Sequence, residues 1–278
     1  MIVDHCSLSW ATDENLSISG PRFDGDTPLQ WRRHTSHDIT YSHNLVFEGL
    51  GHSVHEKGEH SKGTLVHDNA SQVLLYANVY ASNRERNALF KGGARGAMVN
   101  NLIHNPGRLA VHYNLWPQEW GDKPWQTGRL SLVGNVLRHG PDTVPGTPLF
   151  TLGGHGDVEL HAADNLATDV NGQPAPLTGR YTAGPARILD AKVPNLPPRL
   201  RTLPASQLEP ALTLAAGMRP WERDPHDFKL LSDVAEARGK IVDSETDSTG
   251  FPRFKPTRRA FDAAQWLLHD MRDRKSVV

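Results

Sequence analysis

Short β-rich runs that each carry an asparagine near the middle or end recur along the first 170 residues, and this repeat constrains the fold more than any other feature. The asparagine-to-asparagine steps are 34 (44 to 78), 23 (78 to 101), 34 (101 to 135) and 30 (135 to 165) residues. A fixed local motif at irregular spacing is typical of a solenoid whose coils carry loops of different length. The repeating residues are Asn44, Asn78, Asn101, Asn135 and Asn165.

An asparagine in the turn of each coil would have a clear physical role. Its side chain can hydrogen-bond neighbouring backbone groups and tolerate left-handed backbone, and stacked amides can bond from coil to coil. The same asparagines could instead mark the hairpin turns of an antiparallel β protein. Their recurrence favours a β-solenoid, which we place over residues 1–170.

The remainder of the chain, residues 171–278, has a different texture. Residues 171–205 are rich in Pro, Gly and Thr, which predicts an extended strap rather than a packed element. Helical patterns follow the strap. We therefore expect an extended strap and a helical extension that pack on the solenoid.

Two helices are predicted in this extension. Asp224 followed by Pro225 is typical of a helix start, and Gly239 is typical of an end. A second helix is predicted over residues 258–273. The apolar stripes expected to face the solenoid are Phe228, Leu231, Val234 and Ala235 in the first helix, and Phe261, Ala264, Leu268 and Met271 in the second.

Composition excludes several classes of protein. The chain has 30 Lys+Arg against 31 Asp+Glu, so it lacks the basic excess of a nucleic-acid-binding surface. It contains no stretch of 18 apolar residues, which predicts no membrane span. With Cys6 as its single cysteine, the chain can form neither an internal disulfide nor a cysteine-based zinc site.

Three clusters of polar residues carry the chemistry of the chain. Residues 2–14 contain an aliphatic pair before Asp-His, followed by Asp13 and Glu14. Residues 60–65 present Lys62, and residues 83–93 contain Arg86 and Lys91. In this order the clusters resemble the motifs of the pectate lyase family, whose catalytic element reads Arg-x-Pro-x-x-Arg. Asn78 lies eight residues before Arg86, as the strand asparagine of that family does.

The resemblance, which covers residues 1 to about 140, implies a right-handed parallel β-helix that cleaves pectate, polygalacturonate or a related uronate polymer by calcium-assisted β-elimination. It implies a catalytic role for Arg86, substrate binding by Lys62 and Lys91, and Ca²⁺ binding by Asp13 and Glu14. It further implies an acidic polysaccharide as partner, secretion or a periplasmic location, and a monomer when the chain is complete. Three positions depart from the family pattern: Ser17 replaces a calcium carboxylate, Ala88 the proline and Lys91 the second arginine.

These residue types suit the reaction. A uronate carries a carboxylate next to C5, and removing the C5 proton builds negative charge on that carboxyl group. Bound Ca²⁺ and fixed lysine cations would stabilise the charge. The family assigns the base to the arginine that matches Arg86, although arginine is ordinarily protonated. The proton acceptor is therefore either deprotonated Arg86 or a base that Arg86 positions.

Other interpretations of the same residues stay open. Arg86, Lys91 and Lys62 could be solvated surface charges, and Asp13 and Glu14 could cap or turn the chain. A β-helix glycoside hydrolase would need a pair of carboxylic acids, for which Asp13 and Glu14 are the candidates. A carbohydrate-binding β-helix with a weakened site is the non-enzymatic alternative.

Two further groups of residues are ambiguous. The histidines at 52, 55, 60 and 67 suggest a metal site, but their spacing supplies no helix or hairpin that would make them converge, so we expect no transition-metal site there. The tryptophans could stack on sugars or pack in the core. They are Trp10, Trp116, Trp120 and Trp125.

The first residues, 1–5, have the pattern of a strand interior and not of a signal peptide. A β-helix that began there would expose an unpaired strand edge. We therefore expect native N-terminal coils to be missing, together with an upstream calcium carboxylate.

Overall fold

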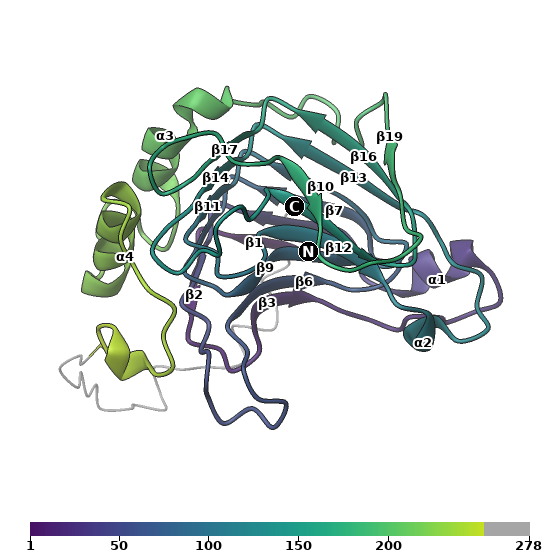
Figure 1. The fold of residues 1–278 in the computed structure, drawn as a ribbon, viewed down its shortest axis with the longest axis horizontal. Coiled ribbons are helices and arrows are strands. Elements are labelled where there is room, and N and C mark those ends of the chain that lie inside the picture. The colour runs from purple at the N-terminus through teal and green to yellow at the C-terminus, as the bar shows by residue number, and fades with distance from the viewer. Residues whose placement is uncertain (253–278) are drawn as a thin grey trace, which may run out of the picture.

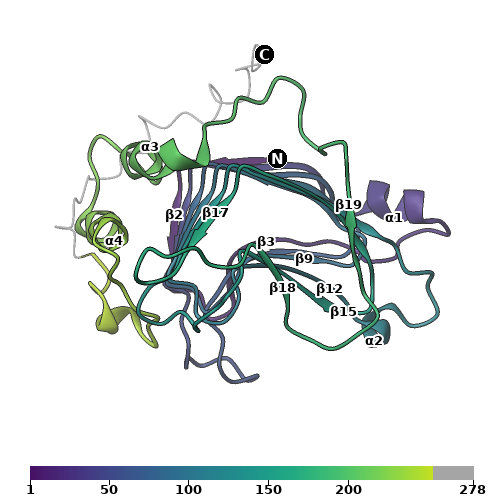
Figure 2. The same cartoon turned by 45° about the horizontal axis from the view of Figure 1, so that its top comes forward.

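The structure, a computed structural model that describes residues 1–252, is a right-handed parallel β-helix. Its strands form three sheets in which every paired neighbour runs parallel, and each coil contributes one strand to each sheet in turn. Figure 2 shows the three sheets surrounding a common interior. The prediction of a β-solenoid, and of the right-handed parallel β-helix implied by the resemblance, is confirmed.

We call the sheets A, B and C. Sheet A is ordered β1 (Ile2–Asp4), β4 (His37–Ser42), β7 (Ser71–Tyr76), β10 (Arg95–Val99), β13 (Gly128–Val133), β16 (Val158–Ala163) and β19 (Ile188–Asp190). Sheet B contains β2 (Ser7–Ser9), β5 (Leu45–Phe47), β8 (Val79–Ala81), β11 (Leu102–His104), β14 (Val136–Arg138) and β17 (Leu166–Thr168). Sheet C contains β3 (Glu14–Ile18), β6 (Lys62–Val66), β9 (Glu85–Lys91), β12 (Val111–Leu115), β15 (Phe150–Gly154) and β18 (Thr178–Arg180).

The interior of the coil is filled by apolar side chains from all three sheets, because alternate residues of each strand point inward. Aromatic and aliphatic residues both belong to this continuous buried cluster. The largest interior side chains, each at most 1% exposed, are Tyr41, Tyr80, Phe90, Met98, Tyr113 and Phe150.

The five repeating asparagines form a ladder at the turn between sheets A and B. The Nδ2 atom of each donates to the Oδ1 atom of the next, from Asn44 to Asn78 at 2.9 Å and on through the remaining steps at 3.0 Å. Each Oδ1 also accepts the backbone N–H of the preceding asparagine. The left-handed backbone falls one residue earlier than predicted, on the residue before each asparagine. The ladder therefore satisfies buried turn amides that the strands cannot reach.

The predicted strap, residues 171–205, is in part a further coil. Its strand β18 pairs with β15 and its strand β19 pairs with β16, so both extend sheets beyond residue 170. The two short runs cover strand edges that would otherwise remain unpaired. Only the following segment is extended, with Leu196 and Leu200 lying against the outer face of sheet A.

Two α-helices pack on the outer face of sheet B, α3 (Leu208–Ala215) and α4 (Pro225–Ala235) (Figure 1). The sequence predicted α4 but not α3. The Oδ1 atom of Asp224 caps α4 by accepting from two backbone amides, as expected. Its stripe differs from the prediction, because Phe228 is 68% exposed and Leu230 is buried instead. The second predicted helix, over residues 258–273, lies outside the described residues.

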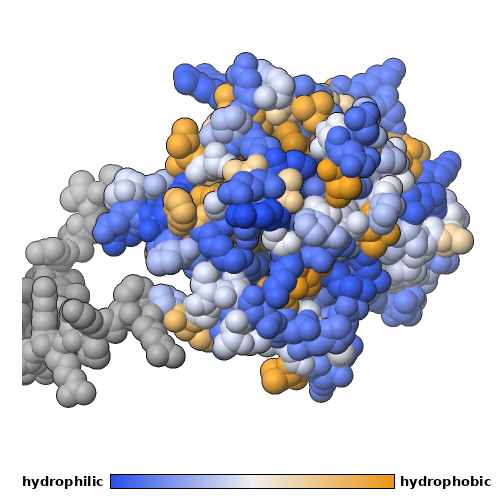
Figure 3. Space-filling view, turned by 60° about the vertical axis from the view of Figure 1, so that its left-hand side comes forward, coloured by the Kyte–Doolittle hydropathy of each residue, from blue (hydrophilic) through white to orange (hydrophobic). Residues whose placement is uncertain are grey.

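Short helical segments complete the described part of the chain. Figure 3 brings the helical side of the molecule forward and shows separate apolar patches between hydrophilic ones. Within residues 1–252, no helix combines the length and the apolar character needed to cross a membrane. The short segments are α1 (Pro28–His34), α2 (Pro117–Trp120), η1 (Ala205–Gln207) and η2 (Glu245–Asp247).

Candidate active site

A row of charged residues crosses the outer side of sheet C where its first strands begin. The register pairs Glu14 of β3 with Lys62 of β6, and Lys62 with Glu85 of β9. Because neighbouring parallel strands lie about 4.8 Å apart, these side chains are direct neighbours. Lys62 and Glu85 are both 8% exposed, so this lysine is not an ordinary solvated surface charge.

Arg86 lies beside this row and forms an ion pair with Glu14. The guanidinium also approaches Glu85, with 4.0 Å between Nε and Oε1. Burial lowers the pKa of Arg86, and the negative charge of Asp13 opposes that shift. The structure therefore brings together Arg86, Lys62 and Glu14, which the sequence placed in three separate motifs.

The backbone beneath Arg86 is irregular. A bulge leaves Ala88 without a partner, because Asn87 pairs with Thr64 and Leu89 with Leu65. Bulges often re-aim a side chain beside a functional site. Strand β6 can approach because residue 63 is glycine: a Cβ there would lie 2.6 Å from the carbonyl oxygen of Arg86.

Buried amides hold this irregular segment. Asn83 Nδ2 donates to Asn87 Oδ1 at 3.1 Å, and Asn15 Nδ2 donates to Asn83 Oδ1 at 3.1 Å. Asn87 Nδ2 in turn donates to the carbonyl of Leu109 at 3.2 Å. These amides therefore link Asn15, which follows Glu14, through Asn83 to Asn87, which follows Arg86.

Asp13 lies next to Lys62, with 3.5 Å between Oδ1 and Nζ. Its two oxygens also face histidines: Oδ1 is 3.6 Å from Nε2 of His60, and Oδ2 is 3.6 Å from Nε2 of His55. The two imidazole rings stack, with centroids 3.7 Å apart. The expectation that these histidines would not converge is wrong for His55 and His60, because the loop between β5 and β6 brings them together.

The other two histidines of the run lie elsewhere. His52 faces Asp243, with 3.3 Å between Nδ1 and Oδ1, and His67 faces Asp68. The spacing of the histidines in the sequence could not show that His55 and His60 converge while His52 and His67 do not. Their positions depend on the conformation of the loop, which is set by tertiary contacts. Residue types alone were the available signal.

Lys91 lies at the far end of β9, five residues from Arg86 and roughly 16 Å away along an extended strand. It pairs with Glu119 of α2. The main chain of Glu119 accepts from Arg22, whose Nε donates to Asp68 at 3.0 Å. The structure thus places Lys91 in a separate cluster of charges and not beside Lys62.

Four residues near Arg86 were not predicted from the sequence. Arg108 binds Glu85 through both Nε at 2.9 Å and Nη2 at 2.5 Å. Tyr181 accepts a hydrogen bond from Asn114 at 2.7 Å and packs edge-on against His112. Burial lowers the pKa of His112 to about 4, so the imidazole is neutral at pH 7. The strand register places these side chains, and no local motif marks them.

The tryptophans divide between core and surface. Trp120 is 1% exposed and packs with Trp31 and Phe23, while its Nε1 donates to Asp68 at 2.8 Å. Trp10 Nε1 donates to Glu48 at 3.1 Å. Trp125, by contrast, is 45% exposed at the surface.

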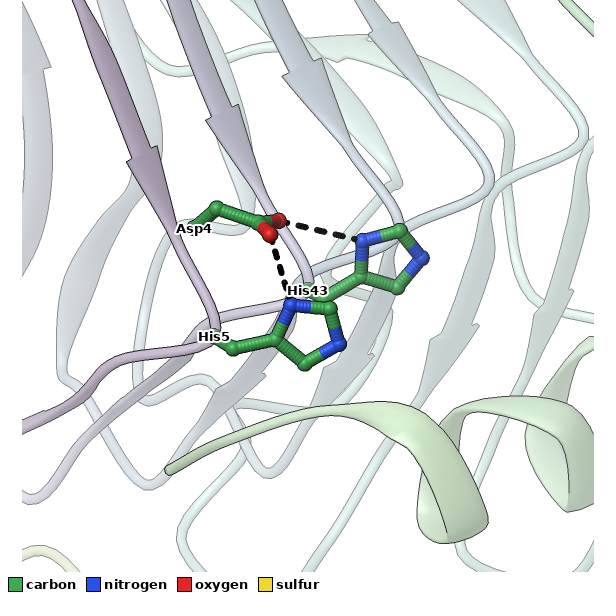
Figure 4. Close-up of side chains that lie close together, drawn as sticks. All are labelled: Asp4, His5 and His43. Atoms are coloured by element: carbon green, nitrogen blue, oxygen red, sulfur yellow. Dashed lines mark hydrogen bonds and ion pairs between the residues drawn. The ribbon is translucent and has the colours of Figure 1, made fainter. Parts of the chain in front are cut away.

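A second group of histidine and aspartate lies on the other side of the coil, at the first turn of the asparagine ladder (Figure 4). Both imidazoles turn Nδ1 toward the same carboxylate, His5 at 2.7 Å and His43 at 3.4 Å from Asp4. Asp4 also accepts from Ser42 Oγ at 2.6 Å. The Asp4 carboxylate is thus engaged by three hydrogen bonds from neighbouring side chains.

The described residues do not supply a calcium site of the usual kind. Calcium takes six to eight oxygen ligands. Asp13 has imidazole nitrogens and Lys62 as neighbours, and the carboxylate of Glu14 is held by Arg86. A metal role for Glu14 stays a prediction, and it would require Arg86 to release this carboxylate.

Comparison with known proteins gives relatives of one kind. No family model matches the chain. The protein named "Probable pectate lyase C" from Aspergillus terreus is 25% identical over 256 residues, which are 90% of this chain and 52% of the relative. Its namesake from Neosartorya fischeri is 26% identical over the same shares, and that from Emericella nidulans is 31% identical over 59% of this chain and 31% of the relative.

Fold and site together define a right-handed parallel β-helix with a cluster of paired charges on its third sheet. The chain is similar in sequence to proteins named as probable pectate lyases, the family whose motifs its own motifs resemble. It spans about half the length of the curated relatives it matches.

Proposed function

We propose that this chain is the β-helical part of a polysaccharide lyase that cleaves pectate, polygalacturonate or a related uronate polymer by β-elimination. The observation that carries the proposal is the convergence of Arg86, Lys62 and Glu14 on adjacent strands of sheet C. Their side chains come from separate motifs that occur in the order of the pectate lyase family. The relatives named as pectate lyases support the same class of reaction.

In this proposal the cations bind substrate carboxylates. Lys62 and Arg86 are held by Asp13 and Glu14 in the free protein, and a uronate carboxylate would replace these partners. Lys91 would bind a carboxylate farther along the polymer. Fixed positive charge in a partly buried site stabilises the carboxylate as it gains negative charge in the transition state.

The step itself breaks the C5–H bond and uses its electron pair to form a C4=C5 double bond. The bond from C4 to the glycosidic oxygen breaks, and that oxygen takes up a proton. Burial lowers the pKa of Arg86, in the direction that a proton acceptor needs. If Arg86 instead positions the base, a neutral imidazole such as His112 is available close by in the register.

The test is the product. A lyase leaves an unsaturated end that absorbs ultraviolet light, whereas a hydrolase leaves none. We expect Arg86→Ala to lower the formation of unsaturated product at least about 100-fold, the usual scale for losing a general base. Polymer binding without any product would favour a carbohydrate-binding protein, and saturated products would favour a hydrolase.

Calcium assistance is a prediction of its own. After EDTA treatment, activity that returns with Ca²⁺ but not with Zn²⁺ would support calcium assistance through Asp13, even though its neighbours are nitrogen donors. Equal activity in EDTA would mean that cationic side chains, and not calcium, stabilise the carboxylate of the substrate. This experiment separates the metal question from the reaction class, because the product is the same in each case.

The place of action follows from the substrate, whereas a monomeric state of the complete chain is what the resemblance to the family implies. An acidic polymer is met outside the cytoplasm, so we propose a secreted or periplasmic protein that acts as a monomer. Cell fractionation and sedimentation of the native protein test both points. A cytoplasmic protein without extracellular activity would contradict the first.

A further inference from the structure

We propose that Asp13, His55 and His60 form a site for a divalent transition metal of the zinc class. Each offers one ligand atom, and the three atoms lie within 4.8 Å of one another. Around an ion bound at about 2.1 Å, tetrahedral ligands lie roughly 3.4 Å apart. The two separations from Asp13, both 3.6 Å, are close to that value and too long for hydrogen bonds.

The hydrogen bonding of His60 leaves one ring nitrogen for a metal. Its Nδ1–H donates to the carbonyl of Gly58 at 2.7 Å, so Nε2 is the ring atom that faces Asp13 and can act as a ligand. That atom and the facing Oδ1 of Asp13 are both buried and without a hydrogen-bond partner among the described residues. A metal ion bound between these two atoms would give both of them a partner. The whole side chain of His60 is 3% exposed, which rules out solvation by bulk water.

His55 is the third ligand, and its ring stacks on that of His60. Its Nδ1 accepts from the backbone N–H of Lys57 at 3.2 Å, a long bond. Metal binding through Nε2 would move the ring proton to Nδ1 and break this bond. The change is local, because His55 and Lys57 lie in the same surface loop.

The donor set selects the kind of metal. One carboxylate and two imidazoles suit Zn²⁺, Co²⁺ or Ni²⁺, whereas Ca²⁺ prefers oxygens alone. Three protein ligands leave a coordination position open. The side chain of Asp13 as a whole is 43% exposed. Lys62 competes with the metal, since its Nζ lies 3.5 Å from Asp13 Oδ1. Lys62→Met should therefore tighten metal binding.

The proposed metal site does not rest on the proposed lyase function. The experiment titrates the EDTA-stripped protein with Zn²⁺ by calorimetry and, in parallel, with Co²⁺ by visible absorption. We expect one tight site, with the visible bands of four-coordinate Co²⁺. His60→Ala and His55→Ala should each weaken binding at least tenfold.

Two matched variants control for other histidines. His52→Ala removes a ring from the same loop that faces Asp243, and His43→Ala opens the second group of histidine and aspartate. Both should keep the site, and circular dichroism should show that all variants remain folded. Absence of a tight Zn²⁺ site, or a site that survives His60→Ala and is lost in His43→Ala, would overturn the assignment. Lyase activity without zinc binding would refute this inference alone, and zinc binding without unsaturated product would refute only the proposed function.

Discussion

At the scale of single residues, the surroundings of Arg86 act on its pKa in two opposite directions. Its guanidinium is drawn into the protein surface, where burial lowers its pKa, yet it is flanked by carboxylates that favour the charged form. Nearby opposite charge typically shifts a pKa by about one to three units. The balance between these two effects should therefore respond to a single substitution of Glu14.

Glu14→Gln tests whether deprotonated Arg86 is the base. Removing the negative charge beside the guanidinium favours its neutral form, so the alkaline rise in the rate of product formation should move down by about one pH unit or more. The measurement is the pH profile of kcat for unsaturated product. An unchanged profile with a lower kcat would indicate that Glu14 and Arg86 serve only to position another base.

At the scale of secondary structure elements, the asparagine ladder joins the coils where strand pairing ends. Asn78 stands in the middle of the ladder. Its Oδ1 accepts from the N–H and Nδ2 of Asn44, and its Nδ2 donates to Asn101 and to the carbonyl of Tyr41. All four partners are buried, and a buried polar group that loses its partner costs about 1–3 kcal/mol.

Asn78→Ala should therefore lower the free energy of unfolding by about 3 kcal/mol or more, since several partners are left unsatisfied at once. Asn165→Ala is the matched control, because Asn165 ends the ladder and is only half-buried. Its loss should be clearly smaller. Denaturant titrations of both variants give the comparison, and equal losses would mean that the ladder does not act as a stack.

At the scale of the whole molecule, the regular parts were predictable and the site was only partly so. The solenoid follows from a local motif that recurs in each coil, and the start of α4 follows from Asp224 and Pro225. Helix α3 escaped prediction because Pro210 interrupts its short apolar pattern. The pairing of Glu14 with Arg86, and of His55 with His60, depends on strand register and on a loop, which no sequence spacing encodes.

Two buried histidines make the stability of the whole molecule depend on pH. His104 of β11 links the β-helix to the segment after α4, with 2.6 Å between its Nε2 and the carbonyl oxygen of Arg238, so the neutral ring donates this bond. Burial lowers the pKa of His104, and likewise of His112, from the ordinary 6.5 to about 4. A depressed pKa means that the unfolded chain takes up protons first as the pH falls.

The free energy of unfolding should therefore be highest above pH 6.5 and should decline as the pH falls toward about 4, by up to about 3 kcal/mol for each of the two histidines. Denaturant titrations at a series of pH values measure the slope. His104→Gln can still donate toward Arg238 but cannot gain a proton, so it should flatten the slope by about half of this combined histidine contribution. His52→Gln, at an exposed ring, is the control for the substitution of histidine by glutamine and should keep the fold. If His104→Gln lowers stability equally at every pH, the histidine contributes packing alone, and the acid sensitivity of the fold has another source.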